Sequence, residues 1–466
     1  MHLNFIFHVL VAFVSFKTKT SLECNSSLIP YPTAPGVVVQ SLTAVPVTNF
    51  SRSINEQYGQ HDTVNVQIWL PDSWNGRFLG TGGGGFAGGE IQRGSLALGV
   101  SQGYATVATD GGHDRSFGVA TAPWAQVSPF NMDQYALHNF ASISLLDMTV
   151  LGKSLTTTFY GSEPRYSYWN CCSTGGRQGF MLVQRYPGSY DGILAAAPGI
   201  NWDRMLAATV YPQVVMNNLS YYPNACELNA ISSAIVAACD GDDGAEDGIL
   251  SAPRLCNFNY SSIVGTTVTC EDGDSLDITS AAVQIAESAY NGPHSSSGEQ
   301  LWFGPTPDSP LTVATGLAVT TCTSNNNCTG ASNPIGNPDF TLDSVEQQYL
   351  SIIGTSDPDL SVFKATGGKI LTWHGLMDEI VPSKGTTDYY SRVEALDLDV
   401  RSFFKHFEAP VRLVEDGESP EVLPARSEAN DGTVRRRNLC PWPLEALYKG
   451  GDPALAESFE CGMGEA

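Results

Sequence analysis

The chain has 466 residues, of which 42% are hydrophobic and 15% charged, and its formal net charge is −24. This composition excludes a disordered chain, and the 46 glycines follow no strict period, which excludes a collagen-like repeat. The acidic balance argues against nucleic acid or an acidic membrane surface as a partner, because both require a basic face on the protein. The length fits about three average domains, or one large α/β domain that carries an insertion.

Residues 1–20 are expected to form a signal peptide. The apolar run Phe5–Phe16 is too short to span a bilayer, but it has the length of a signal-peptide core, and no later stretch is a candidate membrane span. Eleven cysteines and several Asn-x-Ser/Thr sequons also favour a secreted, extracellular protein, because disulfides and N-glycans are added in the secretory pathway. The sequons are at Asn25, Asn49, Asn218, Asn259 and Asn327.

Strand and helix patterns alternate along much of the chain, which indicates an α/β fold with a parallel sheet. The predicted strands are 65–70, 78–80, 104–109, 165–170, 192–197, 369–373 and 400–407, and the predicted helices are 133–151, 176–186 and 384–394. Between about 201 and 363 the chain is rich in Asn, Ser, Thr, Gly and Pro. We therefore expect one α/β domain interrupted by a loop-rich insertion, and such insertions often cover an active site.

Residues 168–178 have the pattern of a nucleophile elbow, in which a strand runs into a serine, small residues and then a helix. Ser173 is the candidate nucleophile. Gly175 supplies one small neighbour, whereas Cys171 stands where the other glycine is usual. The backbone N–H of Thr174 would point at a developing oxyanion. The alternative is that Ser173 only caps the helix.

A serine nucleophile needs a base and an acid that orients the base, and in α/β hydrolases the chain order is serine, acid, histidine. Asp378 follows the late strand 369–373, and active sites of α/β sheets lie at the carboxyl ends of the strands. Asp378 is therefore the candidate acid. The alternative is that it caps the helix that follows.

Several segments resemble the tannase and feruloyl esterase family of secreted serine esterases. They are residues 74–80, 108–113, 172–178, 190–193 with 197–198, and 374–382, and the Cys-Ser-x-Gly-Gly-Arg-Gln block at 172–178 is the most specific. The resemblance implies an α/β-hydrolase fold with a catalytic domain of residues 21–200 and 364–466 and a lid domain of residues 201–363 that binds the phenolic acid. It also implies Ser173 as the nucleophile and Asp378 as the triad acid, with glycines 82–85 lining the oxyanion hole.

The resemblance further implies a structural calcium site in the lid. Residues 239–249 carry carboxylates on a glycine-rich turn, and hard oxygen ligands on a flexible loop suit calcium, although the spacing is not that of an EF-hand. The matching positions are Asp240, Asp243 and Asp247 as side-chain ligands, with Ala245 and Ile249 offering backbone carbonyls. Cys239 and Cys256 would close this loop as a disulfide. A solvated acidic turn is the alternative.

The family has a histidine followed directly by a cysteine after the last strand, and that cysteine bridges to the one before the nucleophile, here Cys172. This chain has no such pair, because the strand-like segment 404–410 is followed at once by 411–417, which resembles the helix beyond the pair. Either an exon is missing from the sequence, or the segment has been lost and the protein is catalytically impaired. We interpret His406, the single histidine after Asp378, as a strand residue rather than a substitute base.

The odd number of cysteines leaves at least one thiol without an intramolecular partner. The pairs expected are Cys239 with Cys256, Cys440 with Cys461, and Cys322 with Cys328.

The sequence thus predicts a secreted serine carboxylic ester hydrolase that acts through an acyl-enzyme on phenolic esters, either small molecules or linked to polysaccharide. One alternative is a binding protein that keeps the pocket without a base. Another is a dinucleotide-dependent oxidoreductase, because residues 80–85 match G-x-G-x-x-G and Asp110 follows at a suitable distance. No clear helix follows these glycines, and an exported chain rarely meets a nicotinamide pool, so the hydrolase is preferred.

Overall fold

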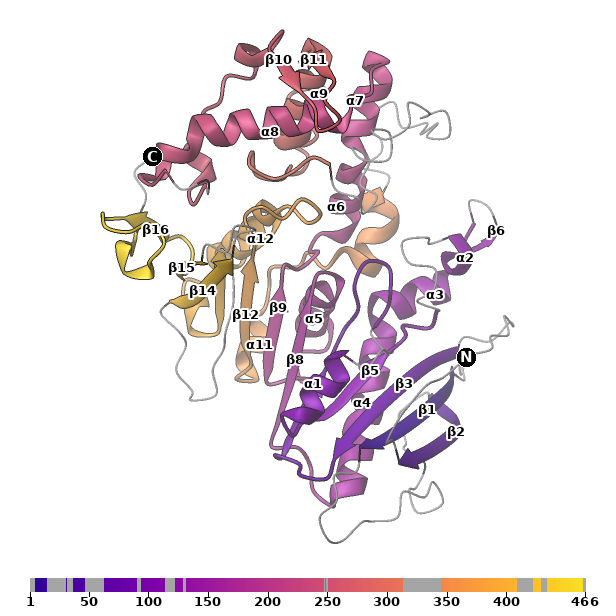
Figure 1. Cartoon of the computed structure of the whole chain (residues 1–466). Helices are drawn as coiled ribbons and strands as arrows, with labels where there is room; N and C mark the ends of the chain where they lie inside the picture. The colour runs from indigo at the N-terminus through magenta and orange to yellow at the C-terminus, as the bar shows by residue number, and fades with distance from the viewer. Residues whose placement is uncertain are drawn as a thin grey trace. The chain divides into compact units, whose positions relative to one another are not determined.

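The computed structural model consists of two compact units (Figure 1). Unit 1 comprises residues 1–199, 357–371 and 401–404, and unit 2 comprises residues 200–356, 372–400 and 405–466. The residues that the structure describes are 5–14, 31, 37–46, 63–89, 94–113, 122–128, 131–246, 248, 250–312, 345–408, 422–428 and 434–463. Unit 2 begins where the sequence predicts the insertion, and it also takes in 372–400 and 405–466, which the sequence assigns to the catalytic domain.

The chain forms a mixed sheet whose strands run in the order β13-β12-β9-β8-β4-β5-β3-β1-β2. Their bounds are Phe5–Val14 (β1), Val37–Pro46 (β2), Thr63–Pro71 (β3), Arg77–Gly80 (β4), Ala105–Thr109 (β5), Tyr166–Cys172 (β8), Gly192–Ala196 (β9), Lys369–His374 (β12) and Phe404–Glu408 (β13). Strands β1–β5, β8 and β9 belong to unit 1, whereas the division between the units falls within β12 and β13. Strand β3 is antiparallel to β5, whereas β4 pairs in parallel with β5 and β8, and β8 with β9. The predicted strands are confirmed, except that 400–402 is a short 3-10 turn (η9, Val400–Ser402) before β13.

The amino-terminal apolar segment is strand β1 of this sheet, paired in parallel with β2 and β3. A run of apolar residues is typical of a strand within a sheet as well as of a signal-peptide core. Cleavage of residues 1–20 therefore stays a prediction.

Helices of unit 1 connect the strands, and α5 is the one that matters most for the site (Figure 1). Their bounds are Gly94–Ser101 (α1), Ala122–Ala125 (α2), Gln134–His138 (α3), Ser144–Tyr160 (α4), Thr174–Arg185 (α5) and Ser361–Ala365 (α11), and β6 (Gln126–Ser128) pairs with β7 (Asn131–Met132). The predicted helix 133–151 is capped by Asp133 and contains a π-helical turn, η3 (Asn139–Ile143), between α3 and α4.

Unit 2 is more helical than its composition suggested. Its elements include α6 (Trp202–Thr209), α7 (Tyr211–Leu219), α8 (Ala225–Cys239), α9 (Ser280–Asn291), α12 (Ser383–Leu396), the π-helical η8 (Leu350–Gly354) and the 3-10 turns η4 (Asp240–Asp243), η5 (Pro253–Leu255) and η6 (Tyr260–Ile263). Polar residues that read as loop signals act as caps: Asn224 accepts from the N–H of Glu227 at the start of α8, and Thr279 from that of Ala282 at the start of α9. Buried Leu228, Ile231 and Ile285 then supply the core of this region.

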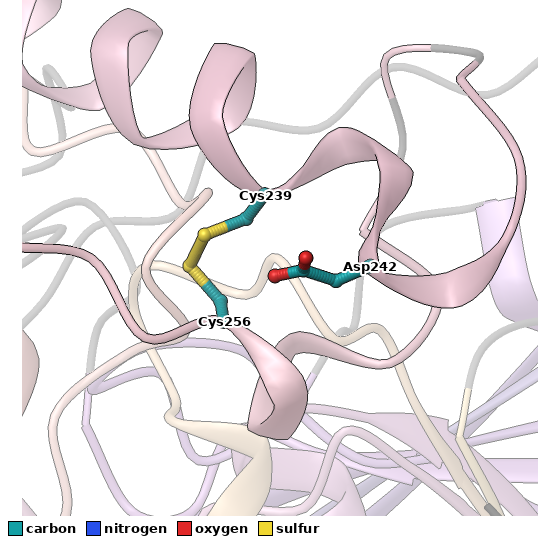
Figure 2. A group of neighbouring side chains, drawn as sticks. All are labelled: Cys239, Asp242 and Cys256. Atoms are coloured by element: carbon teal, nitrogen blue, oxygen red, sulfur yellow. A yellow bond between two sulfur atoms is a disulfide. The ribbon is translucent and has the colours of Figure 1, made fainter.

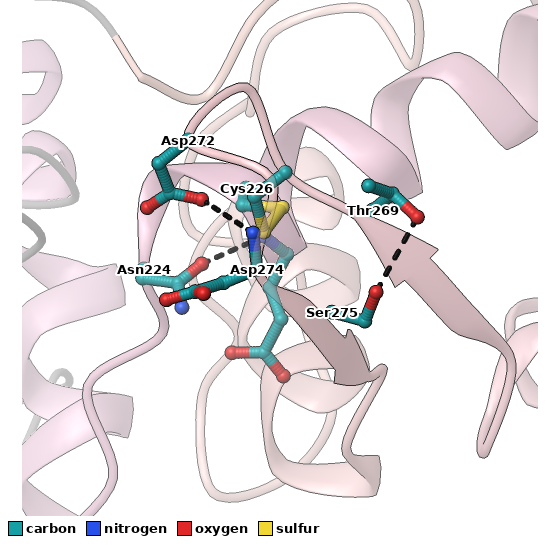
Figure 3. Close-up of a disulfide and its surroundings, with 8 residues drawn as sticks. Asn224, Cys226, Thr269, Asp272, Asp274 and Ser275 are labelled. Carbon is teal, nitrogen blue, oxygen red and sulfur yellow. Dashed lines mark hydrogen bonds between the residues drawn. A yellow bond between two sulfur atoms is a disulfide. The ribbon is translucent and has the colours of Figure 1, made fainter.

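Three disulfides lie among the described cysteines. Cys239–Cys256 and Cys440–Cys461 confirm two predicted pairs, and Cys226–Cys270 is a pair that the sequence did not reveal. Figure 3 shows Cys226 beside Asn224 and the turn of Asp272 and Asp274, which links the short strands β10 (Thr267–Thr269) and β11 (Ser275–Asp277). The predicted Cys322–Cys328 pair lies outside the described residues.

The carboxyl-terminal part of unit 2 consists of two antiparallel hairpins. Strand β14 (Leu423–Glu428) pairs with β15 (Val434–Leu439), and β16 (Glu445–Tyr448) pairs with β17 (Phe459–Gly462), which follows the 3-10 turn η10 (Ala456–Ser458). Among the described residues, no helix combines the length and the apolar character needed to cross a bilayer.

Candidate active site

Ser173 occupies the turn between β8 and α5 in unit 1. Its backbone has φ 60° and ψ −122°, a conformation that non-glycine residues rarely adopt, and its side chain makes no capping hydrogen bond to the helix. Strained backbone of this kind is found at functional sites and costs about 1–3 kcal/mol. The Ser173 N–H donates to Ala196 O at 2.9 Å, so the strain is maintained by the neighbouring strand. The interpretation of Ser173 as a mere helix cap is not supported.

The elbow is compact because glycines stand where side chains would collide. A Cβ on Gly175 would overlap the Cys171 sulfur, and a Cβ on Gly176 would overlap Ala196 O. Cys171 therefore replaces the usual first glycine of the motif without displacing the turn, since Gly175 leaves room for its sulfur. Ser173 itself is half-buried.

A glycine-rich loop lies against the start of α5. The Thr174 hydroxyl donates to Gly85 O at 2.5 Å, and the Gly175 N–H donates to Gly83 O at 2.9 Å. As the first residue of α5, Thr174 has no intrahelical acceptor for its own N–H. The Thr174 amide and the glycine loop thus lie together at the start of α5, where backbone N–H groups can stabilise a negative charge.

Arg177, which follows in the same motif, has a structural place. Its side chain is fully buried and donates to Phe140 O and Ala141 O, two carbonyls of the π-helical turn η3. Burial and the nearby Arg185 charge lower the pKa of Arg177 to about 9. The motif therefore links the nucleophile helix to η3.

Asp378 lies in unit 2, four residues after the end of β12. Its Oδ1 accepts hydrogen bonds from the N–H groups of Ile380 at 3.0 Å and Val381 at 2.8 Å. Helix α12 begins later, with Pro382 at its N-cap position, so Asp378 is not the cap of that helix. Burial raises the pKa of Asp378, but the His374 hydrogen bond and charge and the two backbone donors outweigh burial and hold the pKa below its usual range.

His374 is a partner of Asp378 to which sequence reasoning gave no role. Its Nε2 lies 2.8 Å from Val381 O and 3.3 Å from Asp378 Oδ2, so Nε2 carries a proton, and Nδ1 is hydrogen-bonded to the Thr386 hydroxyl at 2.8 Å. The ring is completely buried. His374 therefore orients the carboxylate and is not itself exposed as a base. In the sequence, the position of His374 four residues before Asp378 is the one signal that could have indicated their contact.

His406 is also buried, within β13. Its Nε2 lies 3.2 Å from the Thr387 hydroxyl, and burial together with the nearby His374 lowers its pKa to about 3. A ring with that pKa accepts a proton poorly at neutral pH. The structure agrees with the interpretation of His406 as a strand residue.

Unit 2 contains a small apolar cavity of about 60 Å³ next to the Asp378 loop. Its walls come from α6, α7, the end of α9, residues 302–311 and residues 379–382. Trp302 is 6% exposed, and its indole N–H has no hydrogen-bond partner among the described residues. Trp302 is one of the residues that line the cavity.

The predicted calcium loop is arranged by its own carboxylates. Asp240 Oδ1 accepts from the Gly248 N–H at 2.7 Å, and the two oxygens of Asp243 accept from Ala245 N–H at 3.0 Å and Ser251 N–H at 2.7 Å. Asp247 and Ile249 lie outside the described residues. In Figure 2 the Asp242 carboxylate lies beside the Cys239–Cys256 disulfide, whose sulfurs are bonded to each other and are not available as metal ligands.

Ser173 belongs to unit 1, whereas Asp378 and the residues of the loop at 240–251 belong to unit 2. The hydrogen bonds described above for Ser173, for Asp378 and for the acidic loop all join residues of the same unit.

Comparisons with known proteins agree on one family. The family described as "Tannase and feruloyl esterase" matches residues 48–462. A probable feruloyl esterase of Arthroderma benhamiae is 35% identical, over 93% of this chain and 88% of that protein. The tannase of Aspergillus oryzae is 27% identical, over 95% of this chain and 91% of that protein.

Solved structures give the same result. The tannin acyl hydrolase from Aspergillus niger superposes with a TM-score of 0.73 at 26% identity, covering 86% of this chain and 83% of that chain. Feruloyl esterase B from Aspergillus oryzae superposes with a TM-score of 0.71 at 26% identity, covering 86% and 88%. The α/β-hydrolase fold is thereby confirmed, and the chain belongs to the tannase and feruloyl esterase family of carboxylic ester hydrolases.

Proposed function

We propose that this chain is a secreted serine esterase that hydrolyses phenolic acid esters, with Ser173 as nucleophile and Asp378 as the acid of its triad. The observation that carries the proposal is the Ser173 elbow, where a strained backbone presents an uncapped hydroxyl at the start of a helix. The relatives named feruloyl esterase and tannase support esters of phenolic acids, either small or linked to polysaccharide, as the substrate class.

In this mechanism the Ser173 hydroxyl attacks the ester carbonyl and forms an acyl-enzyme with release of the alcohol, and water then hydrolyses the acyl-enzyme to the phenolic acid and free Ser173. The Thr174 N–H and an amide of the glycine loop at 82–85 stabilise the negative charge on the carbonyl oxygen. Asp378, kept ionised by its backbone donors and His374, orients the histidine that removes the serine proton. In the family that histidine belongs to the His-Cys segment, which this sequence lacks; its expected position is the junction between Pro410 and Val411, so the full mechanism requires that the segment be encoded there.

The cavity beside Asp378 supports a place for part of the substrate. Its apolar walls suit the edge of an aromatic ring, and the Trp302 indole N–H suits a ring oxygen. A volume of about 60 Å³ accommodates a small group rather than a whole phenolic acid.

The proposed calcium site supports the same family assignment. Asp240 and Asp243 would hold the ion, with Ala245 and Ile249 offering carbonyls and Asp247 a third carboxylate. The donor set fits, because it consists of the hard oxygens that calcium prefers, carboxylates and backbone carbonyls on one turn. The ion would offset repulsion among the carboxylates and stabilise the loop.

Secretion is supported by the disulfides Cys226–Cys270, Cys239–Cys256 and Cys440–Cys461, which persist in oxidising compartments. The sequons at Asn218 and Asn259 present exposed asparagines that an N-glycan could occupy.

The decisive experiment compares the chain with its Ser173→Ala variant on methyl ferulate and methyl gallate. The variant should lose hydrolysis, by about 10⁴-fold or more where the triad is complete, while its melting temperature stays within a few degrees. Equal turnover by both proteins would contradict the serine mechanism. Sequencing the transcript across Pro410–Val411 shows whether the His-Cys segment is encoded.

A second candidate is a catalytically impaired family member that binds phenolic acids without turnover. It is favoured by the burial of His374 and His406, which leaves neither ring exposed as a base. Titration of ferulic and gallic acid, followed by calorimetry, distinguishes it: saturable binding by a parent chain that hydrolyses neither methyl ferulate nor methyl gallate supports the binding protein.

A further inference from the structure

The glycine loop of unit 1 has a tip that faces open space and flanks that are packed. Gly84 and Gly85 are exposed, and a Cβ on either would meet no atom within 4 Å. By contrast, a Cβ on Gly82 would overlap the Gln178 side chain, and one on Gly83 would overlap Ala87 O. The tip is therefore the part of the loop that can reach a ligand, and the flanks determine where it lies.

Gln178 connects both flanks of this loop. Its side chain is completely buried; Oε1 accepts from the Gly83 N–H at 3.0 Å, and the amide group donates to Gly88 O at 2.5 Å. One side chain thus closes the loop from the residue before the tip to a residue beyond it. Because Gln178 stands in α5, only five residues after Ser173, the helix that presents the hydroxyl also fixes the loop.

The position of the loop tip follows from these bonds. Both polar groups of Gly83 are engaged, since its N–H donates to Gln178 and its carbonyl accepts from the Gly175 N–H at 2.9 Å. The next carbonyl but one, that of Gly85, accepts from the Thr174 hydroxyl. The tip of the loop therefore lies at the start of α5, where the Thr174 amide is.

We propose that Gln178 is a positioning residue that holds the tip of the glycine loop, Gly84 and Gly85, where it provides an oxyanion donor for the Ser173 reaction. This inference rests on the proposed serine mechanism. Gln178 does not touch the substrate, and it acts through the loop. Its loss should therefore weaken stabilisation of the transition state more than binding of the ester.

The test uses three variants of the full chain. Gln178→Met keeps the size of the side chain but loses the donor and the acceptor, whereas Gln178→Glu keeps an acceptor for the Gly83 N–H and loses the donor to Gly88 O. Gln184→Met is the matched control, because Gln184 lies on the same helix at a different angle and makes none of the loop bonds described above.

We measure kcat and KM on p-nitrophenyl ferulate, and the affinities for an arylboronic acid and for ferulic acid. The activated ester is chosen because an oxyanion hole alone gives measurable rates when a triad member is missing. Gln178→Met should lower kcat by about 10- to 100-fold and lower boronic acid affinity in parallel, with KM and ferulic acid affinity changed less than about threefold. Gln178→Glu should be intermediate and Gln184→Met unchanged.

The proposal is overturned if Gln178→Met keeps kcat and boronic acid affinity within about twofold of the parent. It is also overturned if the loss of kcat only follows a lower folded fraction and disappears on cooling, because that is the result of a purely structural role.

Failure of the serine mechanism is recognised separately, as equal turnover by the parent chain and Ser173→Ala. The amide hydrogen exchange of residues 82–88 then decides for Gln178. If the Gly83 amide exchanges about tenfold or more faster in Gln178→Met than in the parent, Gln178 anchors the glycine loop as proposed. Equal exchange rates in the two proteins overturn that role.

Discussion

The indole N–H of Trp169 donates to the carbonyl of Gly175 at 2.9 Å, so the strand before Ser173 is bonded to the helix after it. The two arms of the elbow are therefore held together by a buried side chain as well as by the chain itself. This bond, with the overlap of any side chain at position 175 with Cys171, makes Gly175 the most sensitive position of the turn.

Gly175→Ala should destabilise the protein by about 1–3 kcal/mol and lower activity, because the new Cβ forces the Cys171 sulfur or the helix to move. Urea unfolding and ester hydrolysis measure the two effects. Gly188→Ala is the control, since a Cβ there meets nothing within 4 Å. A Gly175→Ala protein as stable and active as Gly188→Ala would contradict the described packing.

Trp302→Phe should weaken recognition of ring oxygens, because it keeps an aromatic ring but removes the indole N–H. KM for methyl ferulate should rise by about 2- to 12-fold, the value of one neutral hydrogen bond, with little change for methyl cinnamate, which lacks ring oxygens. Trp74→Phe serves as control, since its N–H donates to Arg77 O at 2.8 Å, outside the cavity. An equal change for both esters would argue against a hydrogen bond from Trp302.

Calcium removal should lower the melting temperature of the parent chain but not of Asp240→Asn/Asp243→Asn. A ligand present at 100 times its dissociation constant stabilises the folded state by about 2.7 kcal/mol. Differential scanning calorimetry in calcium and in EDTA gives the comparison. Asp272→Asn, an exposed carboxylate on a different turn, should behave like the parent. If the parent melts at the same temperature in both buffers, the loop is a solvated acidic turn.

His406 should make the fold sensitive to acid. The unfolded chain binds a proton at this residue near pH 6.5, whereas the buried ring keeps a pKa of about 3. The unfolded state therefore binds more protons below pH 6.5, and stability falls by roughly 2–3 kcal/mol between pH 6.5 and pH 4.5 from this residue alone.

His406→Gln should flatten that part of the stability curve, measured by urea unfolding at several pH values. His138→Gln is the comparison, because burial and the Arg185 charge lower the pKa of His138 while that side chain remains partly exposed. If the parent and His406→Gln have parallel curves from pH 7 to 4.5, the ring is not held neutral.

The sheet and the elbow were predictable because their signals are local. Short apolar segments between turn residues predict the strands β3, β4, β5, β8 and β9. The turn from β8 into α5 is likewise predicted by consecutive residues around Ser173. Chain order alone placed Asp378 in a loop after a late strand, and the structure has it in the loop that follows β12, whereas its role as triad acid stays a prediction. The Cys239–Cys256 disulfide was expected from the family resemblance, which places these cysteines on either side of one acidic turn, and the structure confirms it.

The remaining features depend on contacts between distant residues. Nothing near Cys226 identifies Cys270 as its partner, 44 residues away, and the cavity at Trp302 brings together residues that no spacing rule connects. The helices of unit 2 were not predicted from the sequence, because asparagine and threonine are common both in loops and at the N-caps of helices. His374 acquires its role only when Val381 and Thr386 turn back to meet its ring.

The carboxyl-terminal hairpins are anchored to β13 independently of the residues that connect them. The Trp442 N–H donates to His406 O at 3.0 Å, and Phe407 bridges to Pro441, while Cys440–Cys461 closes the region on itself. The register of this region is therefore set by its own pairing rather than by the number of residues between Glu408 and Leu423. A segment carrying a His-Cys pair could accordingly be inserted at that junction without a change in the pairing of the hairpins, and it would provide a histidine as proton acceptor.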